Sequence, residues 1–140
     1  MKTKNPKSIV WVGAFLANKN HKYLFLKRSK NSSWGVGKWQ LPGGKLEWGE
    51  EPLHALNREI FEETKLKATN LRLIGTETAL IRAKGNYYHI VQLMYKGKCQ
   101  NQQVEIGQEH DDFKWMKLKT ATSSKLVANL DKFIKREFEY

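Results

Sequence analysis

The chain has 140 residues, 40% of them hydrophobic, which suits one globular domain over residues 1–140, since domains of about 100 to 150 residues are the commonest size. No apolar run approaches the roughly 18 residues that cross a bilayer, and the basic segment 1–7 lacks a small-residue cleavage site, so we expect a cytoplasmic protein with no membrane partner. The net charge of +11 favours polyanionic partners but is spread along the chain, and the lone Cys99 excludes an internal disulfide and any cysteine-built metal site.

The first part of the chain contains short runs of strand-forming residues. Residues 8–16 and 22–27 are rich in β-branched and aromatic side chains and flank a polar turn, so they predict a hairpin. A loop rich in Ser and Gly over residues 29–38 precedes a brief strand at 39–41, which ends at Pro42-Gly43-Gly44, where glycine permits turn conformations. The sequence thus predicts three strands before the first helix.

The second part begins with a helix. Pro52 suits a first helical turn, and apolar residues then recur at helical spacing to about residue 66, namely Leu53, Leu56 and Ile60. Later strands are predicted at residues 71–82, 87–96 and 113–118, the first two joined by a turn at 84–86. A closing helix is indicated by Leu126, Leu130, Phe133 and Ile134. The order of strands, helix, strands and helix predicts an α/β fold, a sandwich in which a mixed sheet is flanked by helices.

Three glutamates of the first predicted helix stand out. Glu59, Glu62 and Glu63 occupy positions i, i+3 and i+4, so they share one face, next to the apolar stripe. Like charges at this spacing repel, and partial burial raises the cost of ionising them. A hard divalent cation such as Mg²⁺ would offset this repulsion, because it takes oxygen ligands shared between carboxylates and phosphates. A solvated acidic face is the alternative for an isolated Glu-Glu pair.

The surroundings of these glutamates favour the metal site. Residues 44–66 resemble the Nudix box, whose pattern is Gly, five residues, Glu, seven residues, then Arg-Glu-hydrophobic-x-Glu-Glu-x-Gly-hydrophobic, here formed by Gly44, Glu50, Arg58, Glu59, Ile60, Glu62, Glu63 and Leu66. The second glycine of the pattern is Lys65 here, and a left-handed helix end costs a non-glycine residue about 1 kcal/mol. Residues 24–28 and 39–44 also resemble the family, which implies a Nudix-type α/β/α sandwich and a hydrolase.

The resemblance implies a metal site and its ligands. Glu59 and Glu63 would bind Mg²⁺, or Mn²⁺ as an alternative ion, with Glu62 as ligand or support and the Gly44 carbonyl as a backbone ligand. Glu109 lies six residues before Trp115, and in similar proteins a glutamate at this place approaches the metal from a separate loop. A surface glutamate in the acidic run 109–112 is the alternative for Glu109.

Other residues are expected to act on the substrate. By resemblance, Glu50 orients Arg58, and Gly43 and Gly44 border the bound substrate. Arg28 should point toward the substrate phosphates, where a guanidinium binds oxygens bidentately; a solvent-exposed arginine at a strand end is the alternative. The general base stays open among Glu59, Glu62, Glu63 and Glu109. Trp34, Trp39 and Trp48 are expected to pack in the core or at its rim, and stacking on a base is the alternative. Structural or surface roles are expected for His21, His54, His89 and His110.

The sequence does not determine the substrate. Residues 37–50 and 86–94 resemble nucleoside triphosphate pyrophosphatases related to MutT, which release a nucleoside monophosphate and pyrophosphate, and modified guanine nucleotides are one implied class. The alternatives are ADP-ribose or another nucleotide sugar, and the 5′ end of an RNA, which the basic charge makes more attractive. A non-catalytic binding module is a further alternative, and a homodimer is implied by the resemblance alone.

Overall fold

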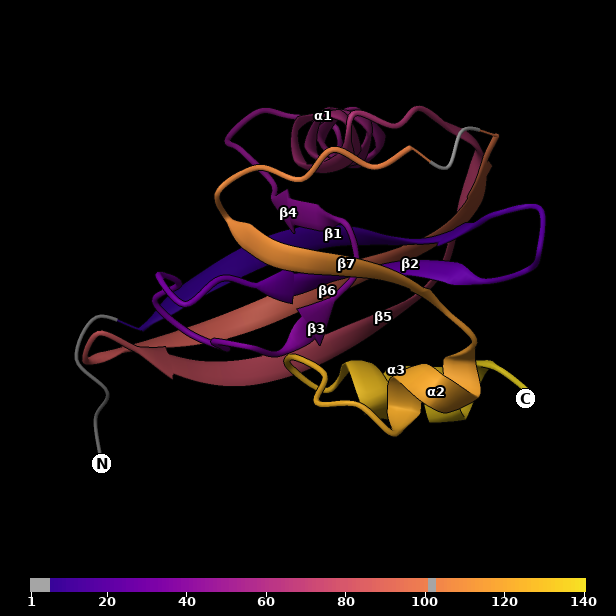
Figure 1. The fold of residues 1–140 in the computed structure, drawn as a ribbon. Helices are drawn as coiled ribbons and strands as arrows, with labels where there is room; N and C mark the ends of the chain where they lie inside the picture. Colours follow the sequence, from indigo (N-terminus) through magenta and orange to yellow (C-terminus); the bar gives the residue numbers. More distant parts are fainter. Residues whose placement is uncertain (1–5, 101–102) are drawn as a thin grey trace.

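A computed structural model describes residues 6–100 and 103–140; residues 1–5 of the basic N-terminal segment and residues 101–102 lie outside it. A mixed sheet lies between helix α1 on one side and helices α2 and α3 on the other (Figure 1), which confirms the predicted α/β sandwich. No helix of the described ranges is long and apolar enough to cross a membrane. The elements are β1 (Lys7–Ala17), β2 (Tyr23–Arg28), β3 (Trp39–Gln40), β4 (Gly43–Lys45), α1 (Pro52–Thr64), β5 (Ala68–Ala83), β6 (Asn86–Cys99), β7 (His110–Met116), α2 (Leu118–Thr122) and α3 (Leu130–Glu137).

Strand β1 pairs with β6 along one edge, and with β4 and then β2 along the other. The change of partner from β4 to β2 positions the site. The path through the sheet is β3-β2-β1-β6-β5, with β4 paired to β1 and β7 paired to β2. Strand β1 runs parallel to β6 along its whole length, but meets β2 only at Ala17 and Tyr23, whereas its Trp11–Gly13 stretch pairs with β4. The predicted hairpin of the first two strands therefore exists only beside its turn. Alternating side chains identify a strand but not its neighbour.

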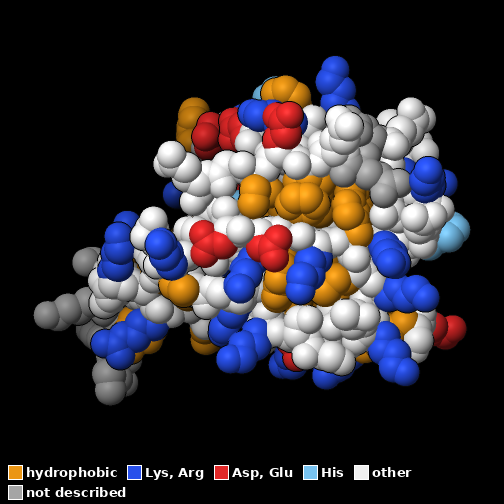
Figure 2. Space-filling view, in the orientation of Figure 1, with side chains coloured by type: hydrophobic (Ala, Val, Ile, Leu, Met, Phe, Trp, Pro, Cys, Tyr) orange, Lys and Arg blue, Asp and Glu red, His pale blue; other side chains and the backbone are white. Residues whose placement is uncertain are grey.

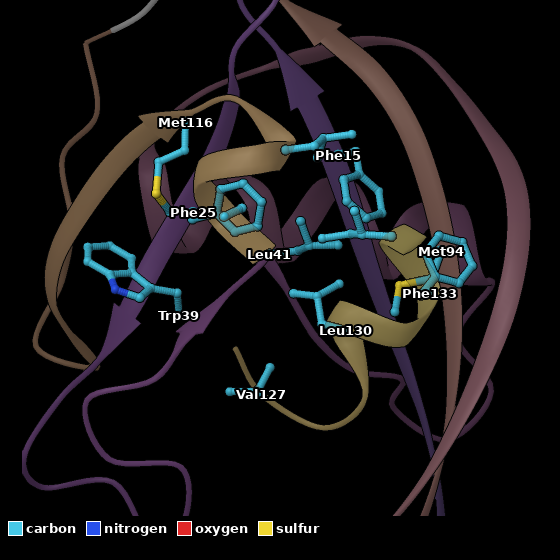
Figure 3. Packing of buried hydrophobic residues seen from close by; sticks show 12 residues of the cluster. Phe15, Phe25, Trp39, Leu41, Met94, Met116, Val127, Leu130 and Phe133 are labelled. Carbon is cyan, nitrogen blue, oxygen red and sulfur yellow. The ribbon is translucent and has the colours of Figure 1, made fainter. Parts of the chain in front are cut away.

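The alternation of side chains along β1 and β2 builds two apolar layers. Val12, Ala14 and Leu16 pack with Leu24 and Leu26 beneath α1, which contributes Ala55, Leu56 and Ile60. Phe15 and Phe25 face the other side of the sheet and pack with α2 and α3; Figure 3 shows this layer, where Met94, Leu130 and Phe133 meet Phe15. Along β1 and β2, the side chains of each layer lie at the period of two expected for a sheet buried on both faces.

The structure corrects several element boundaries. The turn predicted at Gly43-Gly44 is the short strand β4, and the strand predicted at residues 113–118 begins already at His110. Leu118 starts helix α2, a single turn that the sequence analysis did not predict. The closing helix begins at Leu130 instead of Leu126, because Asn129 adopts a left-handed conformation with φ of 65° and Leu126 instead forms a bridge to Trp39.

The first helix ends as the box pattern requires, although the glycine is missing. Lys65 takes the left-handed conformation, with φ of 63°, and its N–H donates to the Phe61 carbonyl. Its ammonium lies 5.1 Å from the centre of the exposed Phe61 ring. Lys65 therefore adopts a backbone conformation that is strained for lysine but not for glycine.

Replacing Lys65 with glycine should raise the free energy of unfolding by about 0.5 to 1 kcal/mol, because it removes left-handed strain that outweighs the entropy lost by glycine. Lys67→Gly is the control, since Lys67 is also exposed but lacks a positive φ, and this change should lower stability. Urea unfolding of both variants checks the difference in sign. Equal effects would contradict a strained helix end.

Candidate active site and metal centre

All of the predicted site residues except Glu50 line one cleft of about 1350 Å³, formed where the partner of β1 changes from β4 to β2. Acidic side chains from α1 line one wall, and the ends of β2, β3 and β4 and the start of β7 line the others. Those with predicted or newly seen roles are Arg28, Gln40, Gly43, Gly44, Arg58, Glu59, Glu62, Glu63, Glu109 and His110. Figure 2 shows acidic side chains at α1 and a second acidic group over β7, with Lys and Arg spread over the rest of this face. The structure thus brings every predicted ligand into one place.

Glu63 is the most deeply placed glutamate of the cleft. Its side chain is 6% exposed, one carboxylate oxygen accepts a hydrogen bond of 2.8 Å from the Gly43 N–H, and the other lies 3.7 Å from His110 Nε2. Burial, together with the charges of Glu59 and Glu109, raises the pKa of Glu63 well above its ordinary value. The carboxylate is therefore costly to ionise unless a cation is present.

Glu59 lies against the backbone of β4. A side chain on Gly44 would place its Cβ 2.6 Å from both Glu59 carboxylate oxygens, so the absence of one lets this carboxylate approach the strand. Burial raises the pKa of Glu59, opposed by a hydrogen bond of 2.9 Å from Arg58 Nη1. Gly44 and Glu59 thus pack directly against each other, and a side chain at position 44 would displace this carboxylate.

Arg58 and Glu50 form a two-pronged pair behind the site. Arg58 Nε and Nη2 each donate to one Glu50 oxygen, at 2.8 and 2.9 Å, while Nη1 bonds Glu59 and, at 3.3 Å, Glu62. Fork geometry of this kind is the strongest ion pairing that proteins use. The side chain of Glu62 is 56% exposed, so it differs from the half-buried Glu59 and the buried Glu63. The predicted partnership of Glu50 and Arg58 agrees with these contacts.

The chemistry of the cluster fits a divalent cation. Ligand atoms of Glu63, Glu109 and His110 all lie within 4.8 Å of one another, and Glu59 feels the charge of Glu109. Three carboxylates facing each other in a partly buried cleft repel, and oxygen ligands with this geometry suit Mg²⁺ or Mn²⁺. Glu59, Glu63 and Glu109 are therefore residues that could hold such an ion.

Arg28 lies in the cleft, held by three contacts. Its Nε donates to the Trp34 carbonyl at 2.8 Å, its Nη1 donates to Gln40 Oε1 at 2.9 Å, and its guanidinium lies 3.9 Å from the centre of the Trp34 ring. Stacking and hydrogen bonding together fix a planar guanidinium. The alternative of a solvent-exposed arginine is wrong, whereas contact with phosphate stays a prediction.

Two residues of the cleft and one tryptophan differ from the expectations drawn from the sequence. Gln40 and His110 line the cleft, 3% and 5% exposed, although His110 was grouped with surface or structural histidines. Its position directly after Glu109 was the available signal. Trp48 is fully exposed and packs in neither core nor rim, while Trp39 is buried as expected. Residues 40 and 110 are far apart in the sequence, and they lie close together because β2 pairs with both β3 and β7.

Comparison with known proteins identifies the family of the chain. A family model described as the NUDIX domain matches residues 7–136, and the chain belongs to the Nudix family. It is 32% identical to an RNA pyrophosphohydrolase of Acinetobacter baylyi over 116 residues, which cover 83% of this chain and 61% of that protein. It is 36% identical to the RNA pyrophosphohydrolase of Psychromonas ingrahamii over 73 residues, 52% of this chain and 38% of the relative. The chain thus spans less than two thirds of these curated relatives.

Solved structures show the same fold. A MutT protein from Methanosarcina mazei Go1 superposes with a TM-score of 0.79 and 26% identity, covering 95% of this chain and 94% of that one. The Nudix domain of Shewanella oneidensis NrtR, complexed with ADP ribose, gives a TM-score of 0.73 at 21% identity, over 92% of this chain and 85% of the other. The fold is therefore shared with a MutT protein and with a Nudix domain that was solved with ADP ribose.

The pair of Glu50 and Arg58 predicts a pH dependence of stability. Hydrogen bonds from Arg58 lower the pKa of Glu50 to about 2 from 4.5, so the pair stabilises the fold above about pH 4.5 and loses its effect as the pH falls toward 2. The difference in unfolding free energy between the natural protein and Glu50→Gln should therefore be constant near neutral pH and shrink over that acidic range. Urea titrations at several pH values measure it.

Glu47→Gln is the control for this experiment, because Glu47 is 70% exposed and lies 3.8 Å from the same guanidinium. It should change stability little at any pH. A difference for Glu50→Gln that does not vary with pH would contradict the proposed pairing.

Proposed function

We propose that the chain is a Mg²⁺-dependent hydrolase that cleaves a phosphoanhydride bond of nucleoside triphosphates, releasing a nucleoside monophosphate and pyrophosphate. The observation that carries this proposal is the cluster of Glu59, Glu63 and Glu109 in one cleft with Arg28. Carboxylates can hold the cation that binds phosphate oxygens, and an anchored guanidinium can bind further oxygens. Carboxylates for a cation and a guanidinium for phosphate oxygens thus line the same cleft.

The residues of the cleft have different roles in the proposed reaction. The cation, when bound, neutralises phosphate charge and lowers the pKa of a coordinated water. Glu59 and Glu63 would hold it, with the Gly44 carbonyl, Glu62 and Glu109 as further candidates. A carboxylate of the cleft would take the proton of the attacking water, whose oxygen bonds to one phosphorus while the bridging oxygen leaves with the other. The base stays open among Glu59, Glu62, Glu63 and Glu109.

Arg58, Glu50 and Arg28 act by fixing position and charge. The fork between Glu50 and Arg58 holds a guanidinium against Glu59, so this carboxylate keeps one orientation. Arg28 faces the same space and stabilises negative charge that develops on phosphate oxygens. Gly43 donates to Glu63 through its backbone, which leaves its substrate-binding role indirect.

The other end of the cleft supports a nucleotide as substrate. Ile9, Ile81, Tyr88 and Ile90 line it, a mainly apolar and aromatic surface next to the acidic wall. Such a surface suits a base or sugar attached to the phosphates. Its side chains do not distinguish guanine or a modified guanine from other bases.

An RNA 5′ end is the second candidate substrate. The named relatives are RNA pyrophosphohydrolases, the chain carries a net charge of +11, and Lys7, Lys45 and Lys84 line the cleft. Lysines around the phosphate site could contact nucleotides beyond the first. Binding of a polyanion at several phosphates falls steeply with salt, whereas binding of a free nucleotide falls little.

A substrate panel tests the proposal. Nucleoside triphosphates, ADP-ribose and triphosphorylated RNA are incubated with Mg²⁺ or with chelator, and released phosphate species are separated. The proposal expects Mg²⁺-dependent formation of monophosphate and pyrophosphate from triphosphates, with weak salt dependence. Turnover of RNA alone, steeply lowered by salt, selects the second candidate, and turnover of ADP-ribose alone selects a nucleotide-sugar enzyme. No turnover of any substrate favours a binding module.

A further inference from the structure

Two hydrogen bonds link Arg28 to His110 through Gln40. Arg28 Nη1 donates to Gln40 Oε1 at 2.9 Å, and Gln40 Nε2 lies 3.0 Å from His110 Nε2. A guanidinium has donors only, so Gln40 must turn its oxygen toward Arg28 and its NH₂ toward His110. The orientation of the Gln40 amide is thus determined by Arg28.

The orientation of Gln40 in turn determines the histidine tautomer. The amide nitrogen carries hydrogens and no free lone pair, so His110 Nε2 must accept, and the ring proton lies on Nδ1. Because its Nε2 lone pair is taken up by Gln40, His110 is not a metal ligand through this atom, although it lies beside Glu63 and Glu109.

We infer that Gln40 is a positioning residue, which holds the Arg28 guanidinium in the cleft and keeps the His110 Nε2 lone pair away from the metal site. The part of this inference in which Arg28 binds phosphate rests on the proposed function. Gln40 itself need not touch the substrate, because both ends of its amide are occupied by Arg28 and His110. Among the described residues, Arg28 Nη2 has no hydrogen-bond partner, so one edge of the guanidinium is left for a phosphate.

A buried glutamine could instead serve only to fill space, and the sequence supplies a control for this alternative. Gln92 is also 3% exposed, but its amide donates to the Ala128 carbonyl outside the cleft. Gln40→Met and Gln92→Met keep a similar side-chain volume while removing the hydrogen bonds. A packing role predicts similar behaviour of the two variants, whereas a positioning role predicts a change at the cleft for Gln40 alone.

The first test reads the tautomer of His110 without metal or substrate. ¹⁵N-histidine-labelled protein is examined by NMR, and His110→Gln assigns its signals. We expect an unprotonated Nε2 in the natural protein and in Gln92→Met, and a protonated Nε2 in Gln40→Glu, whose carboxylate can only accept. A protonated Nε2 in the natural protein, or an unprotonated one in Gln40→Glu, would overturn the inference.

The second test measures binding of inorganic pyrophosphate with Mg²⁺ by calorimetry. Gln40→Met should weaken binding about tenfold, the size of one lost hydrogen bond to a charged group, and Gln92→Met should not. In an Arg28→Met background, Gln40→Met should change nothing further, because Gln40 acts through Arg28. Equal weakening in both backgrounds would contradict positioning.

The two tests separate this inference from the proposed function. If no nucleotide is hydrolysed but the tautomer and pyrophosphate results hold, only the proposed function fails. If nucleotides are hydrolysed while the tautomer is reversed, only the role of Gln40 fails.

Discussion

Replacing Glu63 with glutamine should lower Mg²⁺-dependent turnover by about 10³-fold, the loss typical of removing one group that stabilises charge in the reaction. Glutamine keeps the size and one oxygen of the side chain, so the Gly43 N–H retains its acceptor, but the negative charge facing Glu59 and Glu109 disappears. Single-turnover kinetics with saturating Mg²⁺ measure the effect. A residual turnover within about tenfold of the natural protein would contradict the metal assignment.

The same substitution should make the metal-free protein more stable. Because the pKa of Glu63 is raised in the folded state, its contribution favours folding below pH 4.5 and is lost as the pH rises through the raised value. Glutamine avoids this loss, so the advantage of Glu63→Gln should grow with pH. Glu62→Gln, at an exposed position, is the control and should change stability little. Unfolding in chelator at pH 4.5 and pH 8 measures both variants.

Alanine at Gly44 should lower turnover by about 10²-fold while leaving the fold in place, since small displacements of a catalytic group cost this much. The added Cβ would lie 2.6 Å from both carboxylate oxygens of Glu59, and a side chain is free to move away. Glu59 would then leave its place against β4. Kinetics and thermal unfolding of Gly44→Ala measure the two effects, and unchanged turnover would contradict the fit between Gly44 and Glu59.

Alanine at Gly43, in contrast, should lower the stability of the fold. At Gly43 the Cβ would meet the Val12 carbonyl and come within 2.7 Å of the Gly13 Cα, and both belong to the backbone of the paired strand. Backbone cannot move aside as a side chain does, so we expect a loss of about 3 kcal/mol in unfolding free energy. Equal stability of Gly43→Ala and Gly44→Ala would contradict the β1–β4 packing.

The part of the site that is local in sequence could be predicted. A helix repeats every 3.6 residues, so the spacing of Glu59, Glu62 and Glu63 already implied one shared face, and the structure places all three at the cleft. The family resemblance added Gly44 and Glu109, which lie in the same cleft. The grading of burial, from the buried Glu63 to the exposed Glu62, could not be read from spacing, because it depends on how α1 packs over β4.

The part of the site that depends on strand pairing could not be predicted. Gln40 and His110 meet because β2 pairs with β3 on one edge and with β7 on the other, and no periodic pattern encodes such partners. The parallel pairing of β1 with β6 escaped for the same reason. A single domain over residues 1–140, a cytoplasmic location and a homodimer stay predictions.

A crystal structure with Mn²⁺ and pyrophosphate, examined by anomalous scattering, tests directly whether this cleft is the metal centre. We predict an anomalous peak in contact with the carboxylates of Glu59 and Glu63, with pyrophosphate between the ion and Arg28. An ion bound elsewhere, while the enzyme still hydrolyses its substrate, would contradict the assignment of this cleft as the metal centre.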